Sequence, residues 1–231
     1  MKYYSSAGQL SVMNKKNMSN TETTILFAVR HGETEWNLVG KQQGHLDSAL
    51  TETGIKQAHS LASRLSGKDI HVLYSSDLGR AVQTAEIIAA DLGLEVNIEA
   101  RLRERHLGSM QGMTKDEFRD RFPQEFAAFD SGDPDYEFPG GESARKRYER
   151  SIACCVELAA RHPGGRVLMV AQGGVLNSLF YHALGIALTE PRRFSLFNAA
   201  INNFSVSADR WRLNTWGDTS HLQGITTLDD N

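Results

Sequence analysis

An arginine and a histidine, Arg30 and His31, follow directly on the apolar run of residues 25–29. A ring nitrogen of histidine can act as a nucleophile, and the forked, permanently charged guanidinium group of arginine matches the oxygens of a phosphoryl group. The pair therefore predicts phosphoryl transfer, in which Arg30 grips the group while His31 attacks its phosphorus. A histidine at the end of a strand can also be purely structural, so the prediction needs support from the rest of the chain.

Further polar side chains could serve the same chemistry. Arg80 is expected in the first turn of a helix, where a cation opposes the helix dipole, and this misfit favours a functional reason for its place. Asn37 and Gln43 offer neutral amide donors, which suit phosphate oxygens. Glu104 lies between two arginines, so in isolation it resembles a member of an exposed ion-pair cluster.

These residues must be positioned by an alternation of strands and helices. From residue 24 onward, short β-branched runs alternate with longer helical patterns, which is typical of βαβ units and a largely parallel sheet. Strands are expected at residues 24–30, 71–75, 95–99 and 166–170, with a closing pair of edge strands at 202–207 and 210–216. Helices are expected at residues 51–65, 77–92, 142–162 and 175–184, with Asp77 as the N-cap of the second. The Arg-His pair then lies at the carboxyl end of a strand, bare at the rim of the sheet, where open α/β sheets bind ligands.

The length of 231 residues suits one domain. We expect a disordered tail at residues 1–22 and a single domain at residues 23–231. Residues 101–141 lack strand alternation and carry turn signals around short amphipathic pieces, which predicts a lid over the site at about residues 105–141. The predicted fold is α/β: a three-layer sandwich with a central, mostly parallel sheet, helices on both faces and a small helical lid insertion.

Composition limits the partners that the chain can have. The formal net charge is -3, so we expect neither nucleic acid nor a membrane surface as a partner, and no apolar stretch is long enough to span a bilayer. The histidines lack metal-binding spacings and no P-loop occurs, so we expect no metal and no cofactor. The adjacent Cys154 and Cys155 would be bridged only with strain, which favours buried thiols in a reducing cytoplasm. The expected partner is a small phosphorylated metabolite.

Motifs extend the pattern along the chain. The first block is Arg-His-Gly-Glu-Thr at residues 30–34, and further blocks follow at residues 74–85, 102–108 and 140–143. In this order, and with matching strand and helix context, the blocks resemble the histidine phosphatase superfamily, also called the phosphoglycerate mutase-like family. The resemblance covers nearly everything after residue 24.

The resemblance implies a role for each candidate residue. The family's matching histidine becomes phosphorylated, which makes His31 the nucleophile, and both Arg30 and Arg80 belong to the phosphate pocket. The carboxyl group at the position of Glu104 protonates the departing alkoxide and then helps water attack the phosphohistidine. The substrate-binding positions implied by the resemblance are Asn37, Gln43, Gly44, Gln172 and Gly173.

One position departs from the family pattern, which has a second histidine where this chain has Gln172. An imidazolium would add positive charge beside the phosphoryl group, whereas an amide supplies a neutral donor of roughly half the strength. By analogy with the loss of one transition-state donor, the rate could fall by about 10²–10³. Three explanations stay open: an inactivating change, a naturally slow enzyme, or a binding protein that kept the pocket.

The expected function is that of a metal-independent phosphomonoesterase of the phosphatase branch, which forms a phosphohistidine on His31 and could be weakened by Gln172. The alternatives are mutase-type phosphoryl transfer and a catalytically impaired phosphometabolite-binding protein. Hydrolysis is favoured because residues 109–139 form a shorter insertion than the resembled mutases carry. No pattern in the lid specifies the substrate. A homodimer paired through the closing edge strand is an open alternative to an edge covered by the end of the chain.

Overall fold

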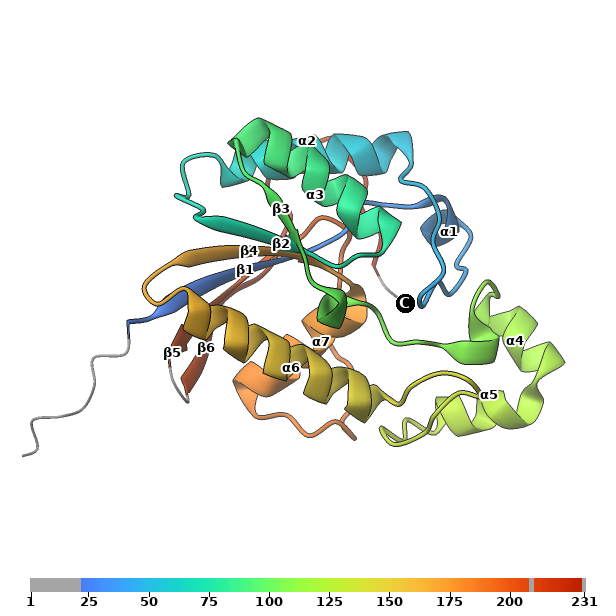
Figure 1. Cartoon of the computed structure of the whole chain (residues 1–231). Helices are drawn as coiled ribbons and strands as arrows, with labels where there is room; N and C mark the ends of the chain where they lie inside the picture. The colour runs from blue at the N-terminus through green and yellow to red at the C-terminus, as the bar shows by residue number, and fades with distance from the viewer. Residues whose placement is uncertain (1–21, 208–209, 230–231) are drawn as a thin grey trace, which may run out of the picture.

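A six-stranded sheet forms the centre of the protein, with helices on both of its faces (Figure 1). The structure is a computed structural model that describes residues 22–207 and 210–229. The strands are β1 (Thr24–Arg30), β2 (Val72–Ser75), β3 (Val96–Ile98), β4 (Arg166–Ala171), β5 (Ile201–Ser207) and β6 (Arg210–Asp218). The helices are α1 (Glu35–Leu38), α2 (Glu52–Leu65), α3 (Gly79–Leu92), α4 (Lys115–Arg121), α5 (Pro123–Asp130), α6 (Ala144–Arg161) and α7 (Gly173–Leu184). The tail expected at residues 1–22 lies, except for its last residue, outside the described residues.

The strands follow the order β3-β2-β4-β1-β5-β6. Strands β1 to β4 run parallel, whereas β5 is antiparallel to β1 and β6 is antiparallel to β5. Arg30 at the end of β1 is paired with Ala171 at the end of β4, so the loops that follow these two strands leave the sheet at the same edge. The predicted closing pair needs one correction: β5 lies between β1 and β6, so of these two strands β6 alone lies at an edge of the sheet.

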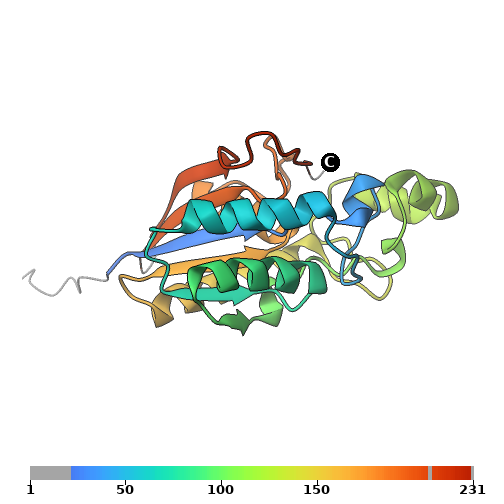
Figure 2. The same ribbon diagram turned by 90° about the horizontal axis from the view of Figure 1, so that it is seen from above.

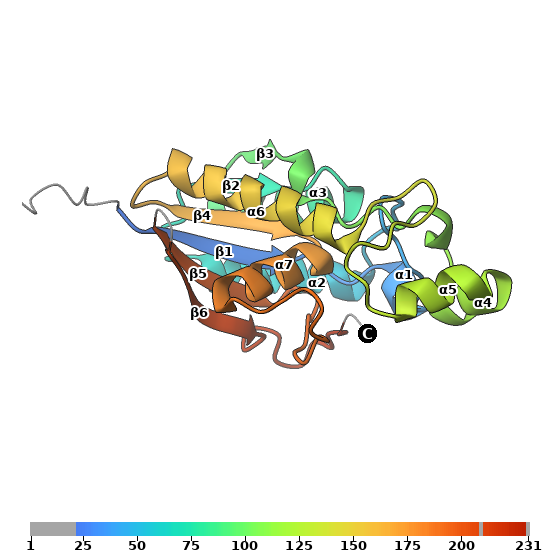
Figure 3. The same ribbon diagram turned by 90° about the horizontal axis from the view of Figure 1, so that it is seen from below.

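Two apolar layers hold the helices on the sheet. Successive side chains of a strand point to opposite faces, so Phe27 and Val29 pack with α2 and α3, whereas Leu26 and Ala28 pack with α6 and α7. Figure 2 views the sheet from the side of α2 and α3, and Figure 3 from the side of α6 and α7. The three layers of the predicted sandwich are therefore present.

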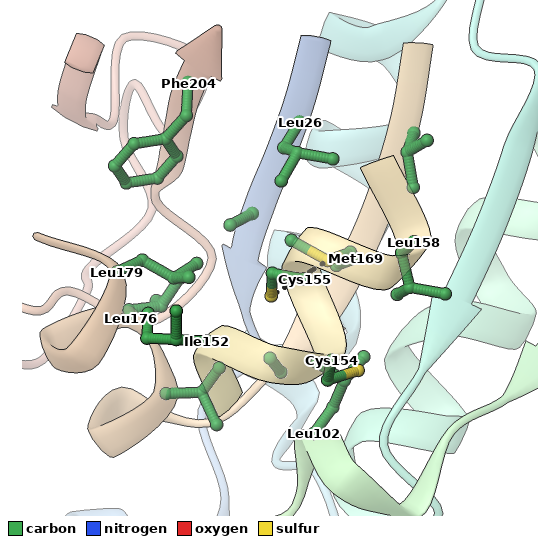
Figure 4. Close-up of a cluster of buried hydrophobic side chains, with 14 of the residues drawn as sticks. Leu26, Leu102, Ile152, Cys154, Cys155, Leu158, Met169, Leu176, Leu179 and Phe204 are labelled. Carbon is green, nitrogen blue, oxygen red and sulfur yellow. Dashed lines mark hydrogen bonds between the residues drawn. The ribbon is translucent and has the colours of Figure 1, made fainter. Parts of the chain in front are cut away.

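The adjacent cysteines of α6 belong to the core, as the sequence predicts. Cys154 and Cys155 are fully buried, and Figure 4 shows them near Leu102, Leu158 and Met169. A hydrogen bond with Cys154, and then burial, raise the pKa of Cys155 well above its ordinary value. A buried thiol that stays protonated is an unreactive apolar side chain.

The beginning of α3 differs from the prediction in the residue that caps it. The expected cap, Asp77, instead accepts hydrogen bonds from the guanidinium group of Arg103. The backbone N–H groups of Gly79 and Arg80 donate to the Asp47 carboxylate, at 2.6 and 3.2 Å. A loop residue that is distant in sequence therefore satisfies the first N–H groups of α3.

The helical insertion, which contains α4 and α5, lies beyond the end of the sheet and next to α1 (Figures 1 and 2). Thr114 and Glu117 form a capping box at the start of α4. The insertion has a small hydrophobic cluster of its own, with Phe118 and Phe138 fully buried in it. Most of its aromatic side chains pack against one another, and only Phe129 of that group also lines the cavity described below.

Candidate active site

A cavity of about 470 Å³ opens at the edge of the sheet where β1 and β4 end. Its walls come from the loop after β1, the first turns of α3 and α7, the helical insertion and the last described residues of the chain. All the site residues expected from the sequence line this cavity: Arg30, His31, Asn37, Gln43, Gly44, Arg80, Glu104, Gln172 and Gly173. Segments far apart in the sequence therefore converge on one place.

His31 lies in the wall of the cavity, and its side chain is held in one protonation state. Its Nδ1 atom is 2.7 Å from the Gly32 carbonyl oxygen, which can only accept, so Nδ1 carries the hydrogen and Nε2 carries a lone pair. Burial, followed by the charges of Arg80 and Arg30, lowers the pKa of His31 well below its ordinary value of 6.5. The residue is only 3% exposed, so it is recessed in the cavity and does not stand bare at the rim as expected. The arrangement gives a neutral imidazole, which is the nucleophilic form.

The glycine after His31 is required by the close approach of two backbone segments. A Cβ atom on Gly32 would stand 2.6 Å from the carbonyl oxygen of Gly54, in the first turn of α2. A Cβ on Gly54 would in turn stand 2.1 Å from the Glu33 oxygen. Real Cβ atoms do not come this close to backbone, so the His31 loop and α2 can pack only with glycine at both positions.

Arg80 turns inward from the first turn of α3 and is almost completely buried. Its guanidinium group donates to the carbonyl oxygens of Gly44 and Leu46, at 2.9 and 2.8 Å, and to the Asp47 carboxylate, at 2.8 Å. Burial lowers the pKa of Arg80, and the charge of Asp47 opposes that shift. The same carboxylate that caps α3 thus also compensates the cation at its N-terminus, which resolves the electrostatic misfit noted in the sequence.

Gln172 is the last residue before α7 and is 1% exposed. Its Oε1 atom accepts a hydrogen bond from Nε of Arg80, at 2.9 Å. Its Nε2 atom is buried and finds no hydrogen-bond partner among residues 22–207 and 210–229. Gln172 and His31 line the same cavity.

The Glu104 carboxylate is held at the N-terminus of α7. One oxygen accepts from the N–H of Arg105, at 2.7 Å, and the other from the N–H of Gly174, at 2.8 Å. A Cβ on Gly174 would stand 2.0 Å from Glu104 Oε1, so any side chain at position 174 would force the carboxylate to move. The exposed ion-pair cluster considered for this carboxylate is wrong, because Arg103 binds Asp77 instead.

Asn37 and Gln43 share a hydrogen-bond network around the hydroxyl of Thr34. That hydroxyl donates to Asn37 Oδ1, at 3.0 Å, and accepts from Gln43 Nε2, at 2.9 Å. The Asn37 carbonyl oxygen thus faces the protein, which orients its Nδ2 donors away from Thr34. The Gln43 amide already donates a hydrogen bond to Thr34, so Gln43 helps to hold the loop that follows β1.

Arg147 is a site residue that the sequence analysis did not single out. Its neighbours on α6, Arg145 and Lys146, pair with Asp135 and Glu137. Arg147, however, is only 8% exposed, lines the cavity, and lies 4.0 Å from Glu104 Oε1. Helical spacing provides the missing signal, since position 147 falls on the same face as the buried residues 151, 154, 155 and 158.

Sequence reasoning also missed the contribution of the last described residues to the cavity. Leu228 and Asp229 line the cavity, and the last described residues lie near the loop that follows β1 (Figure 1). Gln57 donates to the Thr226 carbonyl at 2.7 Å and accepts from the N–H of Glu33 at 2.8 Å. Asn198 donates from its backbone N–H to Leu228 O and from Nδ2 to His31 O, both at 3.0 Å, and its carbonyl oxygen accepts from the Thr227 hydroxyl at 2.7 Å.

Within residues 22–207 and 210–229, no group of three or more His, Cys, Asp or Glu side chains is placed to hold a metal ion. None of the helices in that part of the chain is both long and apolar enough to cross a membrane.

Comparison with known proteins identifies the family. The model of the histidine phosphatase superfamily (branch 1) matches residues 26–219. Phosphoglycerate mutase-like protein 4 of Arabidopsis thaliana is 43% identical over 202 residues, covering 86% of each chain. The metal-independent phosphoserine phosphatase of the same plant is 38% identical over 212 residues, covering 90% of this chain and 87% of that protein. The crystal structure of phosphoserine phosphatase from Entamoeba histolytica with 3-phosphoglyceric acid superposes with a TM-score of 0.77 at 31% identity, covering 86% of this chain and 99% of that one. The chain therefore belongs to the histidine phosphatase superfamily.

Proposed function

We propose that this protein is a metal-independent phosphomonoesterase that hydrolyses a small phosphorylated metabolite through a phosphohistidine on His31. The observation that carries the proposal is the neutral imidazole whose Nε2 lone pair is available beside buried guanidinium groups. A relative that acts on phosphoserine, without metal, supports the same chemistry and a small substrate.

In the first step, Nε2 of His31 attacks phosphorus and the bond from phosphorus to the ester oxygen breaks. Arg30 and Arg80 balance the charge on the three equatorial oxygens, and Glu104 supplies the proton that the departing oxygen takes up. In the second step, Glu104 takes a proton from water, the resulting hydroxide attacks phosphorus, and the phosphorus–nitrogen bond breaks. Inorganic phosphate leaves, and His31 returns to its neutral form.

A phosphate-release assay over a panel of phosphomonoesters tests the proposal. Phosphoserine, phosphoglycerates, sugar phosphates and nucleoside monophosphates cover the classes that the sequence leaves open. We expect at least one of them to be hydrolysed without added metal, and we expect acid-labile phosphate to be trapped on the wild-type chain but not on His31→Ala. Turnover that survives His31→Ala would contradict the proposed mechanism.

Two alternatives give different results in the same assay. Mutase-type transfer, favoured by the name of one relative, would interconvert phosphoglycerate isomers with little phosphate released, which phosphorus NMR detects. A phosphometabolite-binding protein, favoured by Gln172, would bind phosphate but stay inactive both as the wild type and as Gln172→His. Recovery of hydrolysis in Gln172→His would instead identify an enzyme that the amide slows.

A further inference from the structure

Arg105, the residue after Glu104, is a buried cation in the wall of the cavity. It is 7% exposed, and the central carbon of its guanidinium group lies over the ring of Phe138, 4.7 Å from the ring centre. Its Nε atom donates to the Glu142 carbonyl oxygen at 2.7 Å, and its Nη2 atom donates to the Tyr136 carbonyl oxygen at 2.5 Å. These two bonds leave Nη1, which binds nothing in the part of the chain that the structure describes, as the nitrogen that can donate to a ligand.

No carboxylate among the described residues forms an ion pair with Arg105. The Glu142 side chain binds Arg150, at 2.5 Å, and the Glu104 carboxylate faces Arg147, at 4.0 Å. Burial, and then the charge of Arg147, lower the pKa of Arg105 to about 10, so the guanidinium group is still charged at neutral pH. A buried charge without a partner ion is costly, and an anion that enters the cavity would remove that cost.

The position of Arg105 indicates which part of a substrate would carry the anion. In the proposed function, Arg30 and Arg80 hold the phosphoryl group and Glu104 faces the departing oxygen. Arg105 follows Glu104 directly in the chain, and Arg147 lies beside the same carboxylate. The anion therefore belongs on the leaving group, a few bonds from the ester oxygen.

We propose that Arg105, together with Arg147, binds a carboxylate on the leaving group, so that the preferred substrates are phosphate esters of small hydroxy acids. The inference rests on the proposed function in taking this cavity as the site of phosphoryl transfer, and it narrows a substrate class that the sequence of the lid does not specify. A carboxylate fits because it brings one negative charge to the one guanidinium group and accepts from Nη1. The rival interpretation is that Arg105 only ties down the helical insertion through the carbonyl groups of Tyr136 and Glu142.

Two pairs of esters isolate the contribution of the carboxylate. In 3-phosphoglycerate a carboxylate stands where glycerol phosphate has a CH₂OH group, and phosphoserine carries a carboxylate that phosphoethanolamine lacks. A hydrogen bond to a charged group corresponds to roughly 10- to 100-fold in affinity. We therefore expect the wild type to prefer the carboxylated member of at least one pair by about that factor in kcat/KM.

Two substitutions separate binding of the carboxylate from support of the insertion. Arg105→Met removes the charge, whereas Arg105→Lys keeps the charge but lacks the planar fork that joins the two carbonyl groups. If Arg105 binds the carboxylate, Arg105→Met should raise KM for the carboxylated ester alone, with little change in kcat, and Arg105→Lys should keep part of the preference. If Arg105 is only a tether, both variants should slow the two members of a pair equally and leave the preference unchanged.

Arg103→Met is the matched control on the same segment. Arg103 pairs with Asp77 and is not among the residues that line the cavity, so this variant should keep the preference of the wild type. Thermal unfolding checks that each variant folds, and Arg105→Gln, which keeps two neutral donors, replaces Arg105→Met if the latter does not fold. A wild type without preference in either pair, or a preference that survives the loss of the charge, overturns the inference.

The inference and the proposed hydrolysis can fail separately. Release of phosphate from sugar phosphates or nucleotides, with no preference for a carboxylate, would leave hydrolysis standing and overturn the inference. If no ester is hydrolysed, calorimetric titration of the full chain with 3-phosphoglycerate and with glycerol phosphate asks the same question. Tighter binding of 3-phosphoglycerate, which Arg105→Met abolishes, would then support the carboxylate site while the proposed hydrolysis fails.

Discussion

Single atoms decide the chemistry of this site. The Gly32 carbonyl assigns the hydrogen of His31 to Nδ1, and burial, followed by the charges of Arg80 and Arg30, lowers the pKa of the ring. The position of the Glu104 carboxylate depends on the absence of a Cβ atom at Gly174, since a methyl group there would occupy the same space. The reactive groups are therefore positioned by backbone atoms, which a change of side chain elsewhere does not easily move.

Gly174→Ala should reveal the role of Glu104. Alanine favours a helix over glycine by about 1 kcal/mol, so the substitution does not weaken α7 through helix propensity. It should displace the carboxylate, and hydrolysis of alkyl phosphates, whose leaving oxygen needs a proton, should slow much more than hydrolysis of p-nitrophenyl phosphate. The measurement is kcat for both esters, with Glu104→Gln as the reference variant. Equal slowing of the two esters by Gly174→Ala would show that Glu104 does not protonate the leaving group.

The order of elements explains why the candidate residues meet. β1 and β4 are neighbours and parallel, so His31 and Gln172 emerge at the same edge of the sheet. Asp47 helps to hold Arg80 toward them, because it binds both the N-terminus of α3 and the guanidinium group. Asp47 thus links the loop after α1 to α3, and it is a positioning residue of the site.

Asp47→Ala should lower both stability and activity. Loss of a helix cap costs about 0.5–2 kcal/mol, which urea denaturation detects, and a less ordered Arg80 should reduce kcat by about tenfold or more. Asp47→Asn keeps the acceptor and should lie between the wild type and Asp47→Ala. Asp91→Ala serves as the control, because Asp91 pairs with His59 on the surface, where such pairs contribute little. Wild-type stability and kcat in Asp47→Ala would refute this role.

Local patterns predicted the elements well, and distant contacts account for what they missed. Strand β1 and helices α2 and α6 follow hydrophobic periodicities that are visible within the residues of each element. The cap of α3 could not be found in this way, because Asp47 lies 32 residues before Gly79 in the chain. The place of Asp229 in the cavity wall has no local signal either. Arg147 was predictable in principle, since the period of α6 places it on the buried face.

The molecule as a whole contains several histidines whose pKa is lowered by folding. Burial is the first cause that lowers the pKa values of His31, His45, His162, His182 and His221. Below about pH 6.5 the unfolded chain therefore binds more protons than the folded one. The stability that depends on these groups is complete above the unfolded-state pKa and is lost as the pH falls toward the lowered folded-state values.

The free energy of unfolding should accordingly be smaller at pH 5.5 than at pH 7.5. Each unit by which a folded-state pKa is lowered corresponds to about 1.4 kcal/mol once both states have titrated. Urea denaturation at constant ionic strength measures the difference, and His221→Asn should reduce it by removing one of the contributing groups. A protein that is equally stable at both pH values would contradict this account.

The amides of Gln57 and Asn198 each join the segment after β1 to the last described residues of the chain. Neither segment can open without breaking bonds that hold the other, so the two behave as one cooperative unit of local unfolding. The backbone hydrogens of the two segments should therefore exchange with deuterium at a common rate, and a ligand that protects one segment should protect the other.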